Sequence, residues 1–186
     1  MRRPVTFSSR VGDRWSLAIE FEGSGDPPRV WNEWWGSLWL WVDGEVVGRP
    51  FEIEMVMCGI ESLVWSARRV KTESNRLLAA FPANAALDLV MWAQYGDEGS
   101  PPALFAGERS LLLPNEVLPG STVSFFDGWE AILIEDGTEE RFIYRQHGTQ
   151  AKEFCWPIGT FKEVALQARD EFKRLATAGI GGRVDG

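Results

Sequence analysis

Asp-Gly dipeptides between short apolar segments constrain the fold of this chain more than any other feature. Asp43-Gly44 separates two such segments, and Asp136-Gly137 separates residues 130–135 from residues 141–145. An Asp-Gly pair supplies the positive φ angles of a tight hairpin turn. Strands joined by so short a turn must run antiparallel. The sequence therefore predicts antiparallel hairpins, with Asp127-Gly128 as a further turn signal.

Alternation of apolar and polar residues predicts further strands. Residues 15–21 and residues 51–57 alternate with the period of two that a half-buried strand requires. A strand is also expected at residues 122–126. A short one is expected at residues 110–113, within a connection rich in Gly, Pro and charge over residues 97–119.

Three segments have apolar residues at helical spacing. They lie at residues 58–70, at residues 82–95 with Gly96 as the stop, and from Thr160 to about residue 179. Thr160 and Glu163 match the capping box that begins many helices. We therefore predict an α+β fold, in which an antiparallel sheet has about three helices packed on one face.

Length and composition favour one domain. The chain has 186 residues, of which 45% are hydrophobic and 25% are charged, as in ordinary globular domains. Residues 1–186 are therefore predicted to form a single domain. We expect an ordered core over about residues 12–178 and a flexible, Gly-rich tail at residues 179–186.

The charge balance limits the partners of this chain. Asp and Glu number 27 against 19 Lys and Arg, which gives a formal net charge of −8. Because nucleic acids bind to clustered cations, we expect no nucleic-acid partner. No segment has the length and apolarity of a membrane span, and no secretory leader is recognised, so we expect a cytoplasmic protein without a membrane partner.

Catalytic and metal-binding motifs are not recognised. His147 is the only histidine and precedes Gly148 in an expected loop, while Cys58 and Cys155 stand far apart. We therefore expect no cofactor, no metal and no catalytic residues of the nucleophile-and-base type. Neighbouring carboxylates leave a hydrolase as an open alternative. The candidate pairs are Glu20 with Glu22, Glu52 with Glu54, and Glu139 with Glu140.

Ten tryptophans are the compositional oddity of the chain. Trp39 and Trp41 share one face of a strand that is apolar on both sides, so core packing is favoured for them. Trp34 and Trp35 lie in or beside a predicted loop and are candidates for a contact surface, since aromatics are enriched in binding hot spots. Exposed indoles also stack on sugars, which keeps a carbohydrate-binding protein with a Trp-rich site open as an alternative.

Residues 135–140 concentrate four carboxylates at the expected hairpin tip. They form either a solubilising turn or an anionic patch. An anionic patch would accelerate docking to a basic protein.

The order of several motifs resembles the immunity protein 42 family of bacterial polymorphic toxin systems. The motif Phe126-Asp127-Gly128-Trp129 and the strand after it are followed by Glu140-Arg141-Phe142-Ile143-Tyr144-Arg145. The other segments that carry the likeness are residues 16–22, residues 39–48 and residues 157–161, and together they span most of residues 15–176.

This resemblance implies a cytoplasmic, non-enzymatic inhibitor that neutralises a cognate toxin domain by direct binding. The acidic charge of the chain favours a basic toxin such as a nuclease. No catalytic or cofactor-binding residues are implied. The residues predicted to contact the toxin are Trp34, Trp35, Asp136, Glu139 and Glu140.

Overall fold

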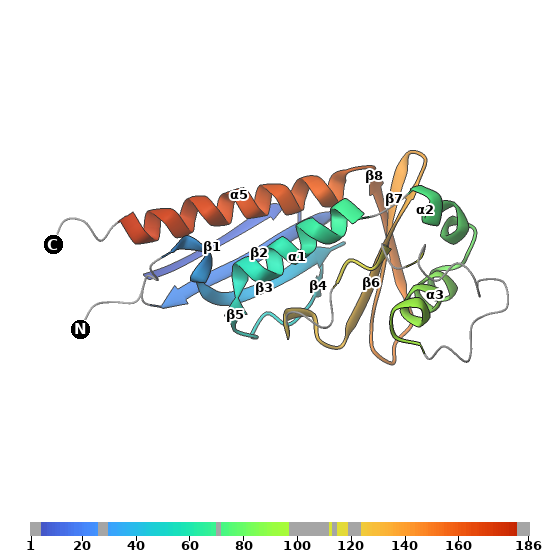
Figure 1. Ribbon diagram of the computed structural model, residues 1–186, viewed down its shortest axis with the longest axis horizontal. Coiled ribbons are helices and arrows are strands. Elements are labelled where there is room, and N and C mark those ends of the chain that lie inside the picture. The colour runs from blue at the N-terminus through green and yellow to red at the C-terminus, as the bar shows by residue number, and fades with distance from the viewer. Residues whose placement is uncertain are drawn as a thin grey trace.

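The computed structural model describes residues 5–25, 30–69, 72–96, 112, 115–118 and 124–181 (Figure 1). The strands form two antiparallel sheets. The strands are β1 (Val5–Gly12), β2 (Leu17–Gly25), β3 (Trp35–Val42), β4 (Glu45–Val47), β5 (Glu54–Met55), β6 (Trp129–Asp136), β7 (Glu139–Gln146) and β8 (Lys152–Pro157). The α-helices are α1 (Val56–Arg69), α2 (Thr72–Ala79), α3 (Ala83–Tyr95) and α5 (Thr160–Gly181), and 3-10 helices occur at η1 (Trp31–Glu33) and η4 (Ser124–Phe126).

The first sheet has the strand order β1-β2-β3-β4, with β5 paired to the start of β3. One face carries Phe21 opposite Leu38 and Ile19 opposite Leu40. Helices α1 and α5 lie side by side across this face (Figure 1). Because strand side chains alternate, the other face carries the residues between these positions, among them Glu20 opposite Trp39.

The second sheet has the order β6-β7-β8, and its strands β6 and β7 are covered on both faces, whereas most of β8 is exposed. Leu133 and Phe142 join the main core together with Phe161 from α5. On the opposite face Ile132 and Ile143 pack in a second cluster with α3 and with Leu78 of α2. Strands buried on two faces read as continuous apolar runs, which is the pattern of residues 131–134.

The α+β class predicted from the sequence is confirmed, but the strands divide between two sheets. The hairpin at Asp43-Gly44 forms with positive φ at both residues. Helices α1, α3 and α5 form where helical spacing predicts them, and the amide of Gly96 donates to the carbonyl of Trp92 at the end of α3. The helices divide as well, because each sheet has its own apolar face to cover.

Several predicted elements differ from the observed ones. Residues 124–126 form η4, not a strand, and only Glu54 and Met55 of the strand expected at 51–57 are paired. Strands β1 and β8 and helix α2 have weak alternation or short length and were not predicted. The expected strand at residues 110–113 lies outside the described residues except for Leu112, and so does the tail at 182–186, while α5 continues to Gly181.

Candidate functional site

The hairpin between β6 and β7 ends in a cluster of four carboxylates, which we call the acidic tip (Glu135, Asp136, Glu139 and Glu140). Asp136 and Glu139 face each other across the turn, as do Glu135 and Glu140 one position further back. Gly137 has a φ of 65°, which the tight turn requires. Asp136 and Glu139 are exposed, so two negative charges lie side by side in solvent at the end of the hairpin.

Glu140 is the buried member of the acidic tip and fixes its position. Its Oε2 accepts hydrogen bonds from the indole Nε1–H of Trp156 at 2.6 Å and from the backbone N–H of Phe161 at 3.0 Å. Its Oε1 accepts from the backbone N–H of Gly159 at 2.6 Å. Helix N-termini favour a carboxylate because their first amides have no partner within the helix. Glu140 therefore joins β7, β8 and the start of α5.

The predicted capping box at Thr160 is not used. The Thr160 hydroxyl donates to the carbonyl of Pro157, and the Glu163 carboxylate accepts from the Gln167 side chain. The first amides of α5 bind the Glu140 carboxylate instead. A side chain from a neighbouring strand thus replaces the local cap, which the spacing of residues along the chain cannot reveal.

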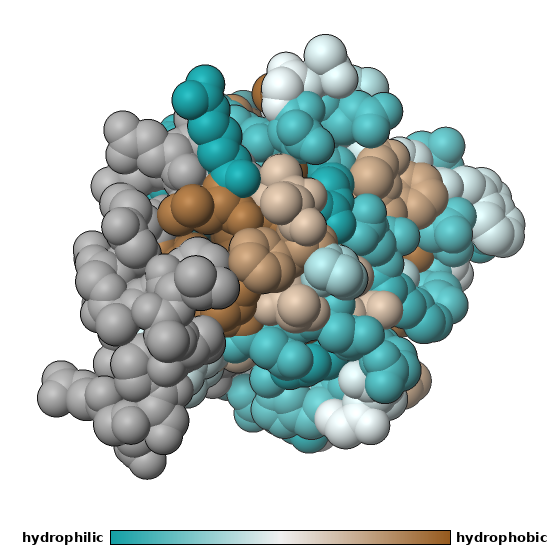
Figure 2. All heavy atoms as spheres, turned by 90° about the vertical axis from the view of Figure 1, so that its right-hand side faces the viewer, coloured by the Kyte–Doolittle hydropathy of each residue, from teal (hydrophilic) through white to brown (hydrophobic). Residues whose placement is uncertain are grey.

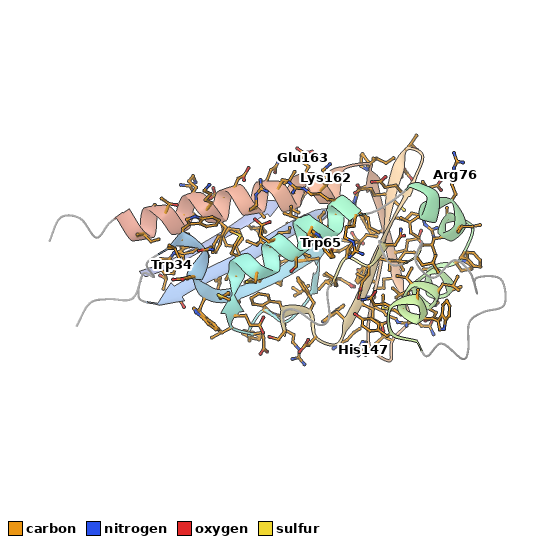
Figure 3. All side chains as sticks on the ribbon, viewed as in Figure 1. Trp34, Trp65, Arg76, His147, Lys162 and Glu163 are labelled. Carbon is orange, nitrogen blue, oxygen red and sulfur yellow. The ribbon has the colours of Figure 1, made fainter. Side chains whose placement is uncertain are left out.

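The carboxyl of Glu135 responds to the burial and the charges around it. Partial burial raises the pKa of the Glu135 carboxyl, the charge of Glu140 raises it further, and Lys162 lowers it. Figure 3 shows Lys162 on the first turn of α5. Among the described residues, Lys162 is thus the one cation that acts on Glu135, within a tip that holds four carboxylates.

Arg141 holds the hairpin just behind the acidic tip. Its guanidinium forms an ion pair with Glu153 on β8 at 2.8 Å and donates to the carbonyls of Ala79 and Phe81, at and just beyond the end of α2. This arrangement ties β7 to both neighbouring elements. The exposed carboxylates Asp136 and Glu139 therefore stand on a hairpin that is anchored on several sides.

A second surface is the face of the first sheet that α1 and α5 leave open. We call it the aromatic face (Trp15, Trp35, Trp39, Trp41, Ile53 and Met55). Trp35, Trp39 and Trp41 alternate along β3 and share this side of the strand. Met55 lies directly opposite Trp35. Trp39 is 7% exposed, whereas Trp35 is 55% exposed.

Trp15 extends the aromatic face beyond the end of β3. The guanidinium of Arg14 lies 4.9 Å from the ring centroid of Trp15 and 5.9 Å from that of Trp41, so it stacks between the two indoles. The Trp41 indole N–H donates to Glu20 at 2.6 Å. A shallow cavity of about 370 Å³ opens near the other end, lined in part by Ile53 and Ser37.

The structure separates the residues that the sequence brought together as toxin contacts. Trp34 is 1% exposed, and its indole N–H donates to the carbonyl of Ala176 on α5 at 3.3 Å. Figure 3 shows Trp34 at the far end of the molecule from Lys162. Trp34 and Glu140 lie in the interior, Trp35 lies on the aromatic face, and only Asp136 and Glu139 share one exposed surface.

The carboxylate pairs that suggested a hydrolase are engaged in structural contacts. Glu20 accepts from Trp41 and lies 3.6 Å from Arg10, and Glu54 accepts from the backbone N–H of Ser124 at 3.0 Å. Glu140 is committed to three N–H donors. One member of each pair is thus held by the fold, which does not favour proton transfer to a substrate.

Other residues considered from the sequence lie at the surface. His147 is exposed, with its Nε2 3.4 Å from Glu130. Cys58 and Cys155 are free and exposed. Within the described ranges, no helix is long and apolar enough to cross a membrane.

A third surface is apolar and lies at the opposite end from the chain termini. Figure 2 shows apolar side chains gathered there, over the end of the molecule that α2 and α3 form.

Together these features define an α+β protein whose distinctive surface features are the acidic tip and the aromatic face. The family model for immunity protein 42 matches residues 8–171. The chain therefore belongs to the immunity protein 42 family, which supports a role in toxin immunity.

A solved structure shares the fold. The crystal structure of CdiI from Burkholderia dolosa AUO158 superposes with a TM-score of 0.61 and 17% sequence identity, over 88% of this chain and 99% of that chain. At this identity the likeness concerns the fold alone. No curated protein sequence matches the chain.

Proposed function

We propose that this protein neutralises a cognate toxin domain by binding it directly, without catalysis, and that the acidic tip is the electrostatic docking point. The observation that carries this proposal is the pair of exposed carboxylates, Asp136 and Glu139, on a hairpin fixed from behind by Glu140. Membership of the immunity protein 42 family supports the inhibitory role.

Charge complementarity favours a basic partner, such as a nuclease domain. The formal net charge of −8 attracts a cationic surface over distances near the Debye length, which is about 8 Å at physiological ionic strength. Such attraction mainly accelerates association, while buried contacts determine how slowly the complex dissociates. A hairpin that is already fixed loses little conformational entropy on binding.

The roles of the predicted contact residues follow from their positions. Asp136 and Glu139 are the proposed contacts, whereas Glu140 positions the hairpin and Trp34 packs in the core. Trp35 lies on the aromatic face, away from the tip. The free thiols of Cys58 and Cys155 support a reducing compartment, so we place the protein in the cytoplasm.

The test is binding to the toxin domain encoded beside this chain. We expect a one-to-one complex whose association rate falls as salt is raised. The double variant Asp136→Lys/Glu139→Lys should lower the association rate roughly tenfold and flatten its salt dependence, because it replaces attraction by repulsion at the docking point. Stopped-flow or surface plasmon resonance measurements at several salt concentrations give both quantities.

A matched control places the same charge change elsewhere. Glu33 and Glu61 are exposed and distant along the chain from the hairpin, so Glu33→Lys/Glu61→Lys alters net charge equally. This control should reduce the rate far less than the tip variant. Equal effects of the two variants would contradict the acidic tip as docking point, and failure of the wild-type chain to bind the toxin would contradict the function itself.

A further inference from the structure

The aromatic face is uncovered within the described part of the chain. Helices α1 and α5 pack on the opposite face of the first sheet, while α2 and α3 pack against the second sheet. Trp15, Trp35 and Ile53 are more than half exposed, and Met55 is 37% exposed. Trp15 stands beyond the end of β3, Trp35, Ile53 and Met55 stand near its start, and Trp39 between them is 7% exposed. Exposed apolar patches on soluble proteins often mark interaction sites.

The charges on this face are balanced. Arg10 lies 3.6 Å from Glu20, its partner across the β1–β2 pair. Arg14 stacks on the indoles of Trp15 and Trp41. This face therefore offers no excess of negative charge to a basic partner, in contrast to the acidic tip. Apolar character with balanced charge is typical of the interfaces between identical subunits.

We propose that the aromatic face binds the same face of a second copy of this chain, related by a two-fold axis. In such an interface the same surface patch of both copies is in contact, so arginines of one copy can approach glutamates of the other. Arg10 and Arg14 together with Glu20 and Glu22 supply both signs on one surface. The two sheets would stack about 10 Å apart, with helices outside, as in a four-layer sandwich.

The exposed side chains supply much of the area that a stable dimer needs. An interface of standard size buries about 800 Å² on each partner. A fully covered aromatic side chain contributes roughly 150–250 Å². Trp15 and Trp35 each expose more than half of their surface, and Ile53 and Met55 add to the sum.

The dimer and the proposed toxin complex use different sides of the molecule. The acidic tip is bonded through Glu140 to the start of α5, and α5 lies on the side of the first sheet away from the aromatic face. The dimer therefore does not depend on the proposed function, and each is tested separately.

Analytical ultracentrifugation over a range of concentrations tests the dimer. We expect the wild-type chain to sediment with twice the mass of 20.9 kDa, with a dissociation constant on the order of micromolar or tighter. The variant Ile53→Glu/Met55→Glu should be monomeric at the same concentrations, because it introduces four like charges across the two-fold axis. Circular dichroism of this variant should match that of the wild type, since both side chains are exposed.

The chain offers a matched control for this variant. Ile158→Glu/Leu77→Glu adds the same two charges elsewhere, at a Leu with the same 37% exposure as Met55 and at another exposed Ile. This control should remain dimeric. A wild-type chain that stays monomeric would overturn the proposal. A dimer that persists in both variants would also overturn it. If the wild-type chain is monomeric and Ile53→Glu/Met55→Glu abolishes toxin binding while the control does not, the aromatic face binds the toxin instead.

Discussion

The two sheets of this protein differ in how their faces are covered. The second sheet is buried on both sides, against the main core and against α2 and α3. The first sheet is buried on one side by α1 and α5, and its other side carries partly exposed tryptophans and paired charges. The charges of this second sheet lie at its margins, in the acidic tip at one end and in the ion pairs of Arg145 with Glu130 and Asp88 at the other. A sheet covered once keeps a face for contact.

This difference also separates the two surfaces that we propose as interaction sites. The acidic tip is small, polar and charged, and it suits fast attraction of a charged partner. The aromatic face is broader and apolar, and it suits a long-lived contact. Substitutions should therefore cost more stability on the sheet that is buried on two faces than on the open face of the other sheet.

The largest effect is expected at Ile143, on the α3-facing side of the second sheet. Ile143→Ala should lower the free energy of unfolding by about 2–5 kcal/mol, because it leaves a cavity in a fully buried cluster. On the open side of the first sheet, Glu22→Ala should change it by less than about 0.5 kcal/mol. Urea unfolding of both variants measures the difference. Similar values for the two would mean that the faces are not distinguished as we describe.

An intermediate effect is expected at Glu140, which anchors the acidic tip. Glu140→Gln replaces one acceptor oxygen by an NH₂ group, so buried N–H donors of Trp156, Gly159 or Phe161 lose their partner. We expect a loss of roughly 1–3 kcal/mol of unfolding free energy. The neighbouring variant Glu139→Gln is the control, and since Glu139 is exposed it should leave thermal stability nearly unchanged. Equal melting temperatures for the two variants would refute the anchoring role.

The smallest effect is expected at the ion pair between Arg141 and Glu153. The hydrogen bond from Arg141 holds the pKa of the Glu153 carboxyl below its ordinary value of 4.5. A carboxyl with a lowered pKa in the folded state contributes stability that is present above the ordinary pKa and is lost as the pH falls through the folded value.

Glu153→Gln should therefore cost about 0.2–1 kcal/mol near neutral pH, and the difference from wild type should shrink below about pH 4.5. Unfolding curves at several pH values measure it. If the difference in unfolding free energy between wild type and variant stays constant or grows as the pH falls, the ion pair of Glu153 with Arg141 does not stabilise the fold.

Local patterns predicted those elements whose residues carry their own signal. The turn at Asp43-Gly44, the hairpin at Asp136-Gly137 and the helix that ends at Gly96 have dihedral or periodic signatures within a few residues. Strand β1 and helix α2 have weak signatures and are stabilised by neighbours, so sequence patterns missed them. The strand expected at 122–126 fails in its described part, because residues 124–126 turn in a 3-10 helix that buries Phe125 and Phe126.

The candidate contact residues were predicted only in part. Adjacent positions such as Trp34 and Trp35, or Glu139 and Glu140, look alike in the sequence, yet one of each pair is buried and the other exposed. In Glu139 and Glu140 this follows from the alternation of the strand, which is readable once the register is known. The indole of Trp34 donates to a carbonyl of α5 that is 142 residues away, and the donors to Glu140 come from β8 and the start of α5, 16 to 21 residues away.

The sequence by itself determined the α+β class, the hairpin turns, the acidic charge and the family likeness, because each depends on short-range patterns or on composition. Only the tertiary structure decided that the strands form two sheets, that a strand carboxylate caps α5, and that the acidic tip and the aromatic face are separate surfaces. The physical reason is that burial and hydrogen-bond partners are set by contacts between segments distant along the chain, which local propensities do not encode.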